Sequence, residues 1–257
     1  MLRLTLLTRV KTMIVIKIGG NAISQLKDDF FHQVKEWTKE GQQVVILHGG
    51  GQLISSTCAF FDLPTEKIDG IRVTPPSVLA LTSHLLTNVI QPHFQNQLAS
   101  AGIPALAVNQ EAGPLFTADY LDQDTYGEVG EVTGIDEAVL AQVSQQDESD
   151  QHPVLLVNSL ASGPNGPLNV NADSAAQALA TMASADQLVL LTDVPGVLVN
   201  EEVVTALNPL KANQLIDQEL ITAGMVPKLQ AAFSALHHGV HKITITNHLG
   251  QGTKLEL

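Results

Sequence analysis

Short apolar runs alternate with helix-like patterns along most of the chain, and this alternation constrains the fold more than any other feature. The apolar runs predict strands at residues 13–18, 43–47, 104–108, 153–157, 187–191 and 242–246. Helical patterns lie between them at 28–40, 52–61, 77–101 and 173–185. Continuous apolar strands that alternate with helices are typical of a mostly parallel sheet covered by helices on both faces. We therefore expect an α/β fold.

Two segments interrupt this alternation. Residues 113–134, with alternating Val and Glu, predict an inserted hairpin, and the polar run 145–151 predicts a surface loop. No Pro-, Gly- or Ser-rich linker divides the chain, so we expect a single domain over 13–257. Residues 1–12 are basic, but their apolar stretch is too short for a signal peptide and no small-residue cleavage site follows. We expect an N-terminal extension there, and Met13 remains an alternative start.

The composition excludes several classes of protein. Of the 257 residues 44% are hydrophobic and 15% are charged, which describes an ordinary globular chain. No apolar run approaches the roughly 18 residues of a membrane span. The net charge of -13 argues against nucleic acid or an anionic membrane as a partner. The lone Cys58 excludes an internal disulfide and suits a reducing compartment, so we expect a cytoplasmic protein.

Positive charge is scarce along the chain. Arg72 is the only arginine after residue 12, and no Lys or Arg lies between Arg72 and Lys211. If the protein binds anions, few residues can neutralise them. The candidates are Lys17, Arg72, Lys211 and Lys228.

Ligands of open α/β sheets bind at the carboxyl ends of the strands, so the turns that follow strands are the candidate sites. Lys17 and the glycines Gly19 and Gly20 end the first predicted strand, where backbone and ammonium can approach a phosphate. The spacing matches neither the P-loop nor the dinucleotide loop. Three glycines, 49–51, follow the second strand and predict an exposed backbone cradle. We interpret the preceding His48 as a packing residue rather than a catalyst.

Three polar residues alternate where the helix predicted at 173–185 begins. An N-cap needs only one such residue, and Asn169, Asn171 and Asp173 are three. Because a helix N-terminus also attracts anions, these residues are candidates for a binding site. Lys228 opens an apolar helix, where the helix dipole disfavours a cation, so we expect it to face an anion. Arg72 is either a solvated surface residue or a bidentate carboxylate ligand.

Eight motifs together carry a resemblance to a known family. They are IKIGG, LHGGG, DGIRVT, GEVGEVTGI, LNVNADSAA, LLTDVPGVL, GMVPKL and GTKL. In this order they resemble the amino acid kinase family, and within it the branch that acts on N-acetylglutamate. The start IGGNAI also resembles carbamate kinases, whose chains are longer, but DGIRVT and LNVNAD fit the acetylglutamate branch better.

The resemblance implies a three-layer αβα sandwich, with the acyl substrate under the N-terminal half and ATP on the C-terminal half. The implied reaction is phosphorylation of the γ-carboxylate of N-acetyl-L-glutamate by ATP, a step of arginine biosynthesis. Two alternatives remain: a sister kinase acting on an aminoadipate-type substrate, and a non-catalytic ligand sensor. Relatives that arginine inhibits assemble through a longer N-terminal helix, so we expect a homodimer without that feedback.

The matching motifs also imply roles for individual residues. Lys17 and Lys228 flank the transferred phosphoryl group, and Asp173 orients them. The implied substrate-binding residues are Gly50, Gly51, Arg72, Asn169 and Asn171. The implied ATP-binding residues are Gly19, Gly20, Asp193, Val194, Gly196, Val197, Leu198, Ile221, Thr222, Gly224 and Met225. Mg2+ is implied as a cofactor that rides on the ATP phosphates rather than on a protein metal site. Ala223 departs from the Gly or Asp that relatives often have, which puts a polar nucleotide contact there in doubt.

Overall fold

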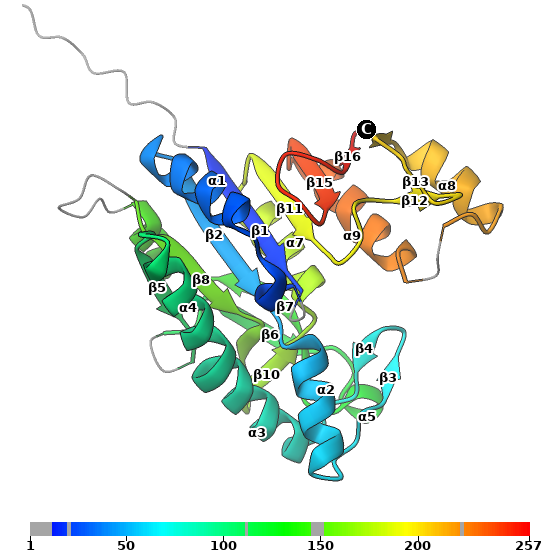
Figure 1. The fold of residues 1–257 in the computed structure, drawn as a ribbon. Coiled ribbons are helices and arrows are strands. Elements are labelled where there is room, and N and C mark those ends of the chain that lie inside the picture. Colours follow the sequence, from blue (N-terminus) through cyan, green and yellow to red (C-terminus); the bar gives the residue numbers. More distant parts are fainter. Residues whose placement is uncertain (1–11, 20–21, 111–112, 145–151, 222–223) are drawn as a thin grey trace, which may run out of the picture.

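The computed structural model describes residues 12–19, 22–110, 113–144, 152–221 and 224–257. Its centre is an eight-stranded sheet in the order β14-β16-β15-β11-β1-β2-β8-β5 (Figure 1). The strands are β1 (Met13–Ile18), β2 (Gln43–His48), β5 (Ala105–Val108), β8 (Val154–Asn158), β11 (Gln187–Leu191), β14 (Ala206–Leu207), β15 (Lys242–Thr246) and β16 (Thr253–Leu255). Within the described ranges, every neighbouring pair except β15 and β16 is parallel. The predicted mostly parallel sheet is confirmed.

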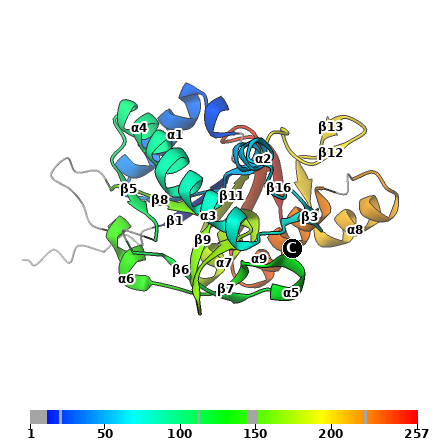
Figure 2. The ribbon, with the colours of Figure 1, turned by 90° about the horizontal axis from the view of Figure 1, so that it is seen from below.

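Helices cover both faces of the sheet, as predicted. One face carries α1 (Asp28–Lys39), α3 (Pro76–His84) and α4 (Gln91–Ser100), and the other carries α7 (Ala172–Met182) and α9 (Val226–His237) (Figure 2). Along β1, Ile14, Ile16 and Ile18 pack in the core on the α1 side, and Val15 packs on the α7 side. Since strand side chains alternate between faces, Lys17 also lies on the α7 side. This places the only charged residue of β1 in the layer of α7 and α9.

The predicted hairpin insertion belongs to a small closed barrel. It consists of β6 (Phe116–Tyr120) and β7 (Val129–Ile135), which pair antiparallel, together with β9 (Leu160–Gly163) and β10 (Gly166–Val170). The short helix α5 (Gln123–Tyr126) joins β6 to β7, and α6 (Glu137–Leu140) and the 3-10 turn Ala141–Ser144 follow β7 and precede β8. β10 ends directly before α7, so the barrel delivers the chain to the N-terminus of that helix.

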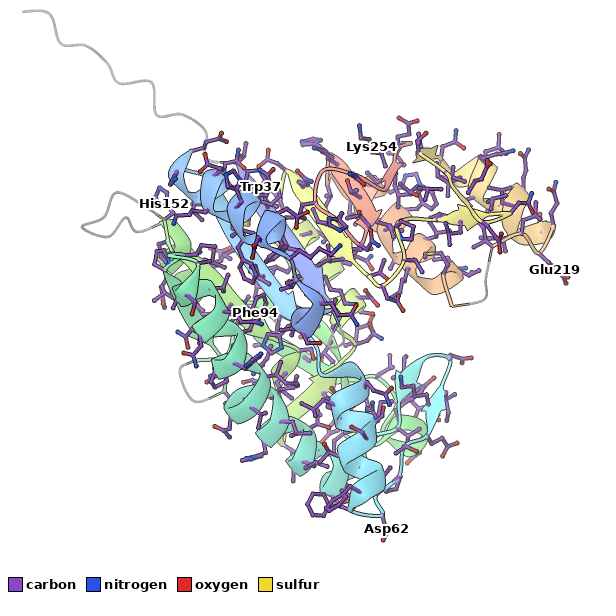
Figure 3. All side chains as sticks on the ribbon, in the orientation of Figure 1. Trp37, Asp62, Phe94, His152, Glu219 and Lys254 are labelled. Atoms are coloured by element: carbon purple, nitrogen blue, oxygen red, sulfur yellow. The ribbon has the colours of Figure 1, made fainter. Side chains whose placement is uncertain are left out.

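The single helix predicted over 77–101 has an internal irregularity. A π-helical stretch, Leu85–Ile90, joins α3 to α4, and Pro92 lies in the first turn of α4. Proline has no N–H to donate to the preceding turn, which explains a change of helical pitch at this point. The buried Gln91 donates from Nε2 to the carbonyls of Val108 and Leu156, which ties the helix to β5 and β8. Phe94, labelled in Figure 3, is fully buried one turn further on.

Two groups of elements lie outside the layers over the sheet (Figure 1). The first contains α2 (Gly51–Phe60), β3 (Lys67–Ile68) and β4 (Ile71–Arg72), and the second contains β12 (Leu198–Val199), β13 (Glu202–Val203) and α8 (Pro209–Asp217). Asp62 and Glu219 mark their outer ends in Figure 3. The 3-10 turn Ile23–Gln25 leads from β1 to α1. Within the described ranges, no helix combines the length and apolar character that crossing a membrane requires. The extension over 1–11 and the loop predicted at 145–151 lie outside the described residues.

Candidate active site

The carboxyl ends of the strands and the N-termini of three helices meet around one cavity. α2 begins at Gly51, α7 at Ala172 and α9 at Val226. The cavity has a volume of about 290 Å³. Basic, glycine and polar side chains dominate its lining: Lys17, Gly19, Gly49, Gly50, Gly51, Lys67, Arg72, Ser159, Asn169, Asn171, Asp173 and Lys228. The free backbone N–H groups at helix N-termini favour anions, so both the backbone and the basic side chains suit this cavity to an anionic ligand.

This cavity gathers every residue predicted for catalysis or for acyl-substrate binding. Those residues come from β1, the 49–51 loop, the β3–β4 hairpin, β10, and the first turns of α7 and α9. Segments more than 200 residues apart in the chain, such as Lys17 and Lys228, are brought together by the parallel sheet. Their placement agrees with the sequence analysis, and their individual roles remain predictions.

One carboxylate holds two ammonium groups in the cavity. Lys17 Nζ lies 2.9 Å from Asp173 Oδ1, and Lys228 Nζ lies 2.5 Å from Asp173 Oδ2. The three side chains are 10%, 26% and 20% exposed for Lys17, Lys228 and Asp173 respectively, so water reaches them only partly. The group carries a net single positive charge. It can therefore accept a further anion without first releasing a partner.

Burial and the neighbouring charges shift two of these groups in a defined direction. Burial lowers the pKa of Lys17 from its ordinary value, and this outweighs the opposite influence of Asp173 beside it. For Asp173, burial alone would raise the pKa, but Lys17 and Lys228 outweigh it and hold the pKa of this carboxyl below its usual value. Asp173 is therefore ionised at neutral pH, which suits an organising residue and not a general base.

Two glycines of the 49–51 loop, Gly49 and Gly50, have little room for a side chain. A Cβ at Gly49 would lie 3.2 Å from the Cβ of Ala172, and one at Gly50 would lie 2.2 Å from Ile54 Cδ1. The neighbouring Gly51 has a φ of 43°, a left-handed conformation that favours glycine. His48 is fully buried beneath the loop, and burial lowers its pKa to about 4, so it is neutral and packs rather than titrates near neutral pH. All three glycines line the cavity.

Arg72 is a buried cation with neutral partners. Its Nη2 donates to Ser55 Oγ at 2.7 Å and to the Gly51 carbonyl at 3.4 Å. Its Nη1 is buried and has no hydrogen-bond partner among the described residues. No carboxylate of the described residues forms an ion pair with Arg72. Burial lowers the pKa of Arg72, although a guanidinium stays protonated at physiological pH. A free donor on an uncompensated charge is the arrangement expected for binding a carboxylate.

The two amides of the 169–173 segment have different tasks. Asn171 Oδ1 accepts from the backbone N–H groups of Asp173 and Ser174, at 2.9 and 3.2 Å, and so caps α7. Asn169 donates from Nδ2 to Thr74 Oγ1 at 3.0 Å and lines the cavity. The cap therefore needs only Asn171, which leaves Asn169 and Asp173 for other contacts.

The residues predicted to bind ATP are more dispersed. Gly19 lines the cavity, where a Cβ would lie 3.9 Å from Lys17 Nζ. Val197, Ile221 and Met225 are buried in the core on the α7 side, and a Cβ at Gly196 would lie 2.7 Å from Thr253 Oγ1. Val194 and Leu198 are partly buried, and Gly224 is exposed. Gly20 and Thr222 lie outside the described residues. A nucleotide-binding role for this set remains a prediction.

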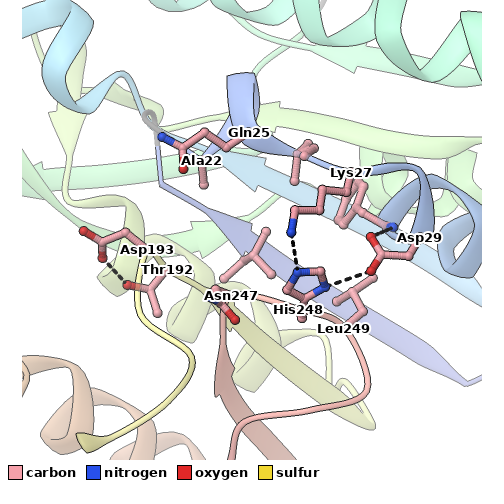
Figure 4. Close-up of a pocket in the computed structure, with 12 residues that line it drawn as sticks. Ala22, Gln25, Lys27, Asp29, Thr192, Asp193, Asn247, His248 and Leu249 are labelled. Carbon is pink, nitrogen blue, oxygen red and sulfur yellow. Dashed lines mark hydrogen bonds and ion pairs between the residues drawn. The ribbon is translucent and has the colours of Figure 1, made fainter. Parts of the chain in front are cut away.

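Asp193 lines a second cavity, of about 190 Å³, where α1 begins beside the ends of β11 and β15 (Figure 4). Thr192 Oγ1 donates to Asp193 Oδ1 at 2.9 Å at one side of it. At the other side, His248 Nδ1 lies 2.8 Å from Asp29 Oδ2, and His248 Nε2 lies 3.3 Å from Lys27 Nζ. These contacts link the start of α1 to the loop after β15.

One basic residue of the cavity, Lys67, was not among the candidates from the sequence. Lys67 lines the cavity because β3 pairs with β4 and places it directly opposite Arg72, whereas the expected candidate Lys211 lies exposed on α8. The Asp-Gly pair at 69–70, flanked by two apolar residues, is a sequence signal for a two-residue hairpin turn. A hairpin with this turn predicts that Lys67 lies opposite Arg72. No comparable sequence signal marks Ser55 as the partner of Arg72.

Comparison with known proteins identifies the family. A model of the amino acid kinase family matches residues 12–247. The acetylglutamate kinase of Lactiplantibacillus plantarum is 41% identical over 93% of this chain and 94% of its own length. That of Streptococcus mutans is 40% identical over 95% of this chain and 98% of its own. A crystal structure of a Streptococcus mutans protein is also similar, with a TM-score of 0.86 and 38% identity over 95% of this chain and 98% of that one.

The parallel α/β sheet, the glycine loop and the two lysines on one carboxylate define a protein built for phosphoryl transfer. More narrowly, the chain belongs to the amino acid kinase family.

Proposed function

We propose that this kinase transfers the γ-phosphoryl group of ATP to the γ-carboxylate of N-acetyl-L-glutamate, giving N-acetyl-L-glutamyl 5-phosphate and ADP in arginine biosynthesis. The observation that carries the proposal is the presence of separate cationic groups in one cavity: Lys17 and Lys228 around Asp173, and the free guanidinium nitrogen of Arg72. Such a cavity suits a dicarboxylate with one carboxylate bound and the other reacting. The acetylglutamate kinases at 35–41% identity support this substrate over an aminoadipate-type one.

The chemistry requires charge neutralisation rather than proton transfer. A γ-carboxylate with a pKa near ~4.3 is already ionised at neutral pH, so no general base is needed. The barrier comes from bringing this anion up to the polyphosphate in line. Lys17 and Lys228 lower that repulsion, the N–H groups of the 49–51 loop bind oxygen atoms, and Asp173 keeps the two ammonium groups in place.

The substrate is bound at its non-reacting end by other residues. In this proposal Arg72 binds the α-carboxylate, Asn169 contacts the acylamino group, and Gly50, Gly51 and Asn171 complete the pocket. Lys67, opposite Arg72, adds positive potential at the same end.

ATP is proposed to bind against the C-terminal half, where Asp193, the segment 194–198 and Met225 lie, with the acyl substrate under the N-terminal half. Both oxygens of Asp173 already face lysines, so the donor set of the cavity suits a Mg2+ ion held by the ATP phosphates rather than by this carboxylate. When bound, that ion neutralises phosphate charge. We also propose a homodimer in the cytoplasm, and light scattering after size-exclusion chromatography tests the dimer.

Coupled detection of ADP tests the proposed reaction. The purified chain is incubated with Mg-ATP and, in turn, with N-acetyl-L-glutamate, N-acetyl-L-2-aminoadipate, N-acetyl-L-aspartate, L-glutamate and carbamate. We expect the highest kcat/KM with N-acetyl-L-glutamate. A higher value with the aminoadipate derivative or with carbamate would overturn the substrate assignment, and ADP release with none of them would overturn the enzymatic proposal.

A further inference from the structure

The hydroxyl of Thr74 connects two residues of the cavity that come from distant parts of the chain. Thr74 is fully buried and does not line the cavity itself. Its Oγ1 donates to the carbonyl of Arg72 at 2.8 Å and receives a hydrogen bond from Asn169 Nδ2 at 3.0 Å. The Thr74 side chain therefore forms hydrogen bonds both to β4, which carries Arg72, and to the Asn169 amide on β10.

The two hydrogen bonds of Thr74 Oγ1 determine the orientation of the Asn169 side-chain amide. A threonine hydroxyl has a single hydrogen, and the Arg72 carbonyl can only accept it. The Asn169 atom that contacts Thr74 must then be a donor, so it is Nδ2 and not Oδ1. Because Asn169 lines the cavity, its Oδ1 is the atom left for a ligand. In the described part of the chain this oxygen accepts no hydrogen bond.

The backbone around Thr74 holds the hydroxyl in place. Thr74 N–H donates to the Tyr126 carbonyl at 2.8 Å, and the Glu128 N–H donates to the Thr74 carbonyl at 2.7 Å. Asn169 N–H in turn donates to the Glu128 carbonyl at 3.0 Å. Between them, Gly127 has a φ of 72°, and a Cβ there would lie 2.6 Å from the Thr74 carbonyl oxygen. These backbone hydrogen bonds fix the distance between the β3–β4 hairpin and β10. The rigid backbone on both sides therefore holds Thr74 and Asn169 within hydrogen-bonding distance.

We propose that Thr74 is a positioning residue that presents Asn169 Oδ1 to the cavity as an acceptor for the N–H group on Cα of the substrate. This inference rests on the proposed function. An acceptor at this place favours a substrate that bears an N–H donor and disfavours one that presents only an oxygen, because two facing acceptors leave both unpaired. Without the Thr74 hydroxyl the amide is free to rotate, and this discrimination is lost.

The test compares two substrates and three variants. 2-Acetoxyglutarate keeps both carboxylates and the acetyl carbonyl of N-acetylglutamate but replaces the N–H by an oxygen. Thr74→Val removes the hydroxyl with little change of shape, and Thr74→Ser keeps the hydroxyl and loses the methyl. Thr82→Val is the matched control, since Thr82 is equally buried and its Oγ1 has no hydrogen-bond partner among the described residues.

For Thr74→Val we expect the KM for N-acetylglutamate to rise roughly five- to twenty-fold, the loss of about one hydrogen bond, with the KM for ATP and the kcat changed less than two-fold. The KM for 2-acetoxyglutarate should change less than two-fold. Thr74→Ser and Thr82→Val should match the wild type on both substrates.

Other outcomes separate the two proposals. A wild-type chain that releases no ADP with N-acetylglutamate contradicts the proposed function. An active wild type in which Thr74→Val raises the KM equally for both glutarate compounds, or for neither, overturns the role of Thr74. If Thr74→Val does not fold, a Thr74→Ser variant that also loses N-acetylglutamate affinity overturns it, because the hydroxyl is then not the cause.

Discussion

Replacing Arg72 by alanine should separate substrate binding from stability, because the guanidinium is buried without an ionic partner. In the free protein its contacts are one hydrogen bond to Ser55 Oγ and a longer one to the Gly51 carbonyl. Its Nη1 has no partner in the described ranges, so the charge is desolvated without compensation until a carboxylate binds.

The expected magnitude follows from the bonds a carboxylate would form. Each charge-assisted hydrogen bond contributes about 1.5–3 kcal/mol, so loss of a two-pronged contact should raise the KM for N-acetylglutamate by roughly 10²-fold or more. The KM for ATP should change far less, since the nucleotide is proposed to bind against the other half of the chain. Thermal stability should stay near that of the wild type, because Arg72→Ala also removes the cost of burying an unpaired charge. Arg72→Lys should recover only part of the affinity, as an ammonium cannot reproduce the planar fork.

Saturation kinetics with each substrate varied in turn measure these effects, with the unfolding midpoint as a stability readout. Lys211→Ala is the charge-matched control, since Lys211 is exposed on α8 and does not line the cavity. Equal KM changes for ATP and N-acetylglutamate, or no change for either, would refute the assignment of Arg72 to the α-carboxylate.

The remaining predictions concern the two lysines and the carboxylate between them. Lys17→Met and Lys228→Met should each lower kcat by roughly 10²–10³, the effect of losing a group that stabilises transition-state charge, and a variant with near-wild-type kcat would exclude that role. Because Asp173 has a folded-state pKa below its ordinary value of 3.8, its contribution to stability is present above that value and is lost as the pH falls through the lowered pKa. The urea midpoints of wild type and Asp173→Asn should therefore differ at neutral pH and converge at acid pH; a difference that persists there would contradict the ion-pair account.

The strands and the layering could be predicted from the sequence because both are local. The apolar runs that became β1, β2, β8 and β11 are buried on both faces, so continuous hydrophobicity was enough to identify them. The π-helical stretch before α4 could not be predicted in the same way. Pro92 is a local signal for an irregularity, but the bonds of Gln91 to β5 and β8 join residues far apart in the chain, and no local pattern encodes them.

For the cavity, residue types were more predictable than partners. Glycines after a strand and polar residues before a helix indicated the 49–51 loop and the 169–173 segment. The same pattern could not show that Asn171 alone caps α7, nor that Asn169 bonds to Thr74, since the latter contact spans 95 residues. Lys67 was absent from the sequence candidates for a related reason. The sequence shows how few basic residues the chain has, but it does not show which of them lie together. The pairing of β3 with β4 places Lys67 opposite Arg72.

The central claim, phosphorylation of a carboxylate, is tested most directly by trapping the product with hydroxylamine, which converts an acyl phosphate to a hydroxamate. With Mg-ATP, N-acetyl-L-glutamate and hydroxylamine, we expect one equivalent of the N-acetylglutamyl hydroxamate for each ADP released, and little hydroxamate from N-acetyl-L-2-aminoadipate. ADP release without hydroxamate, or a larger yield from the aminoadipate derivative, would contradict it.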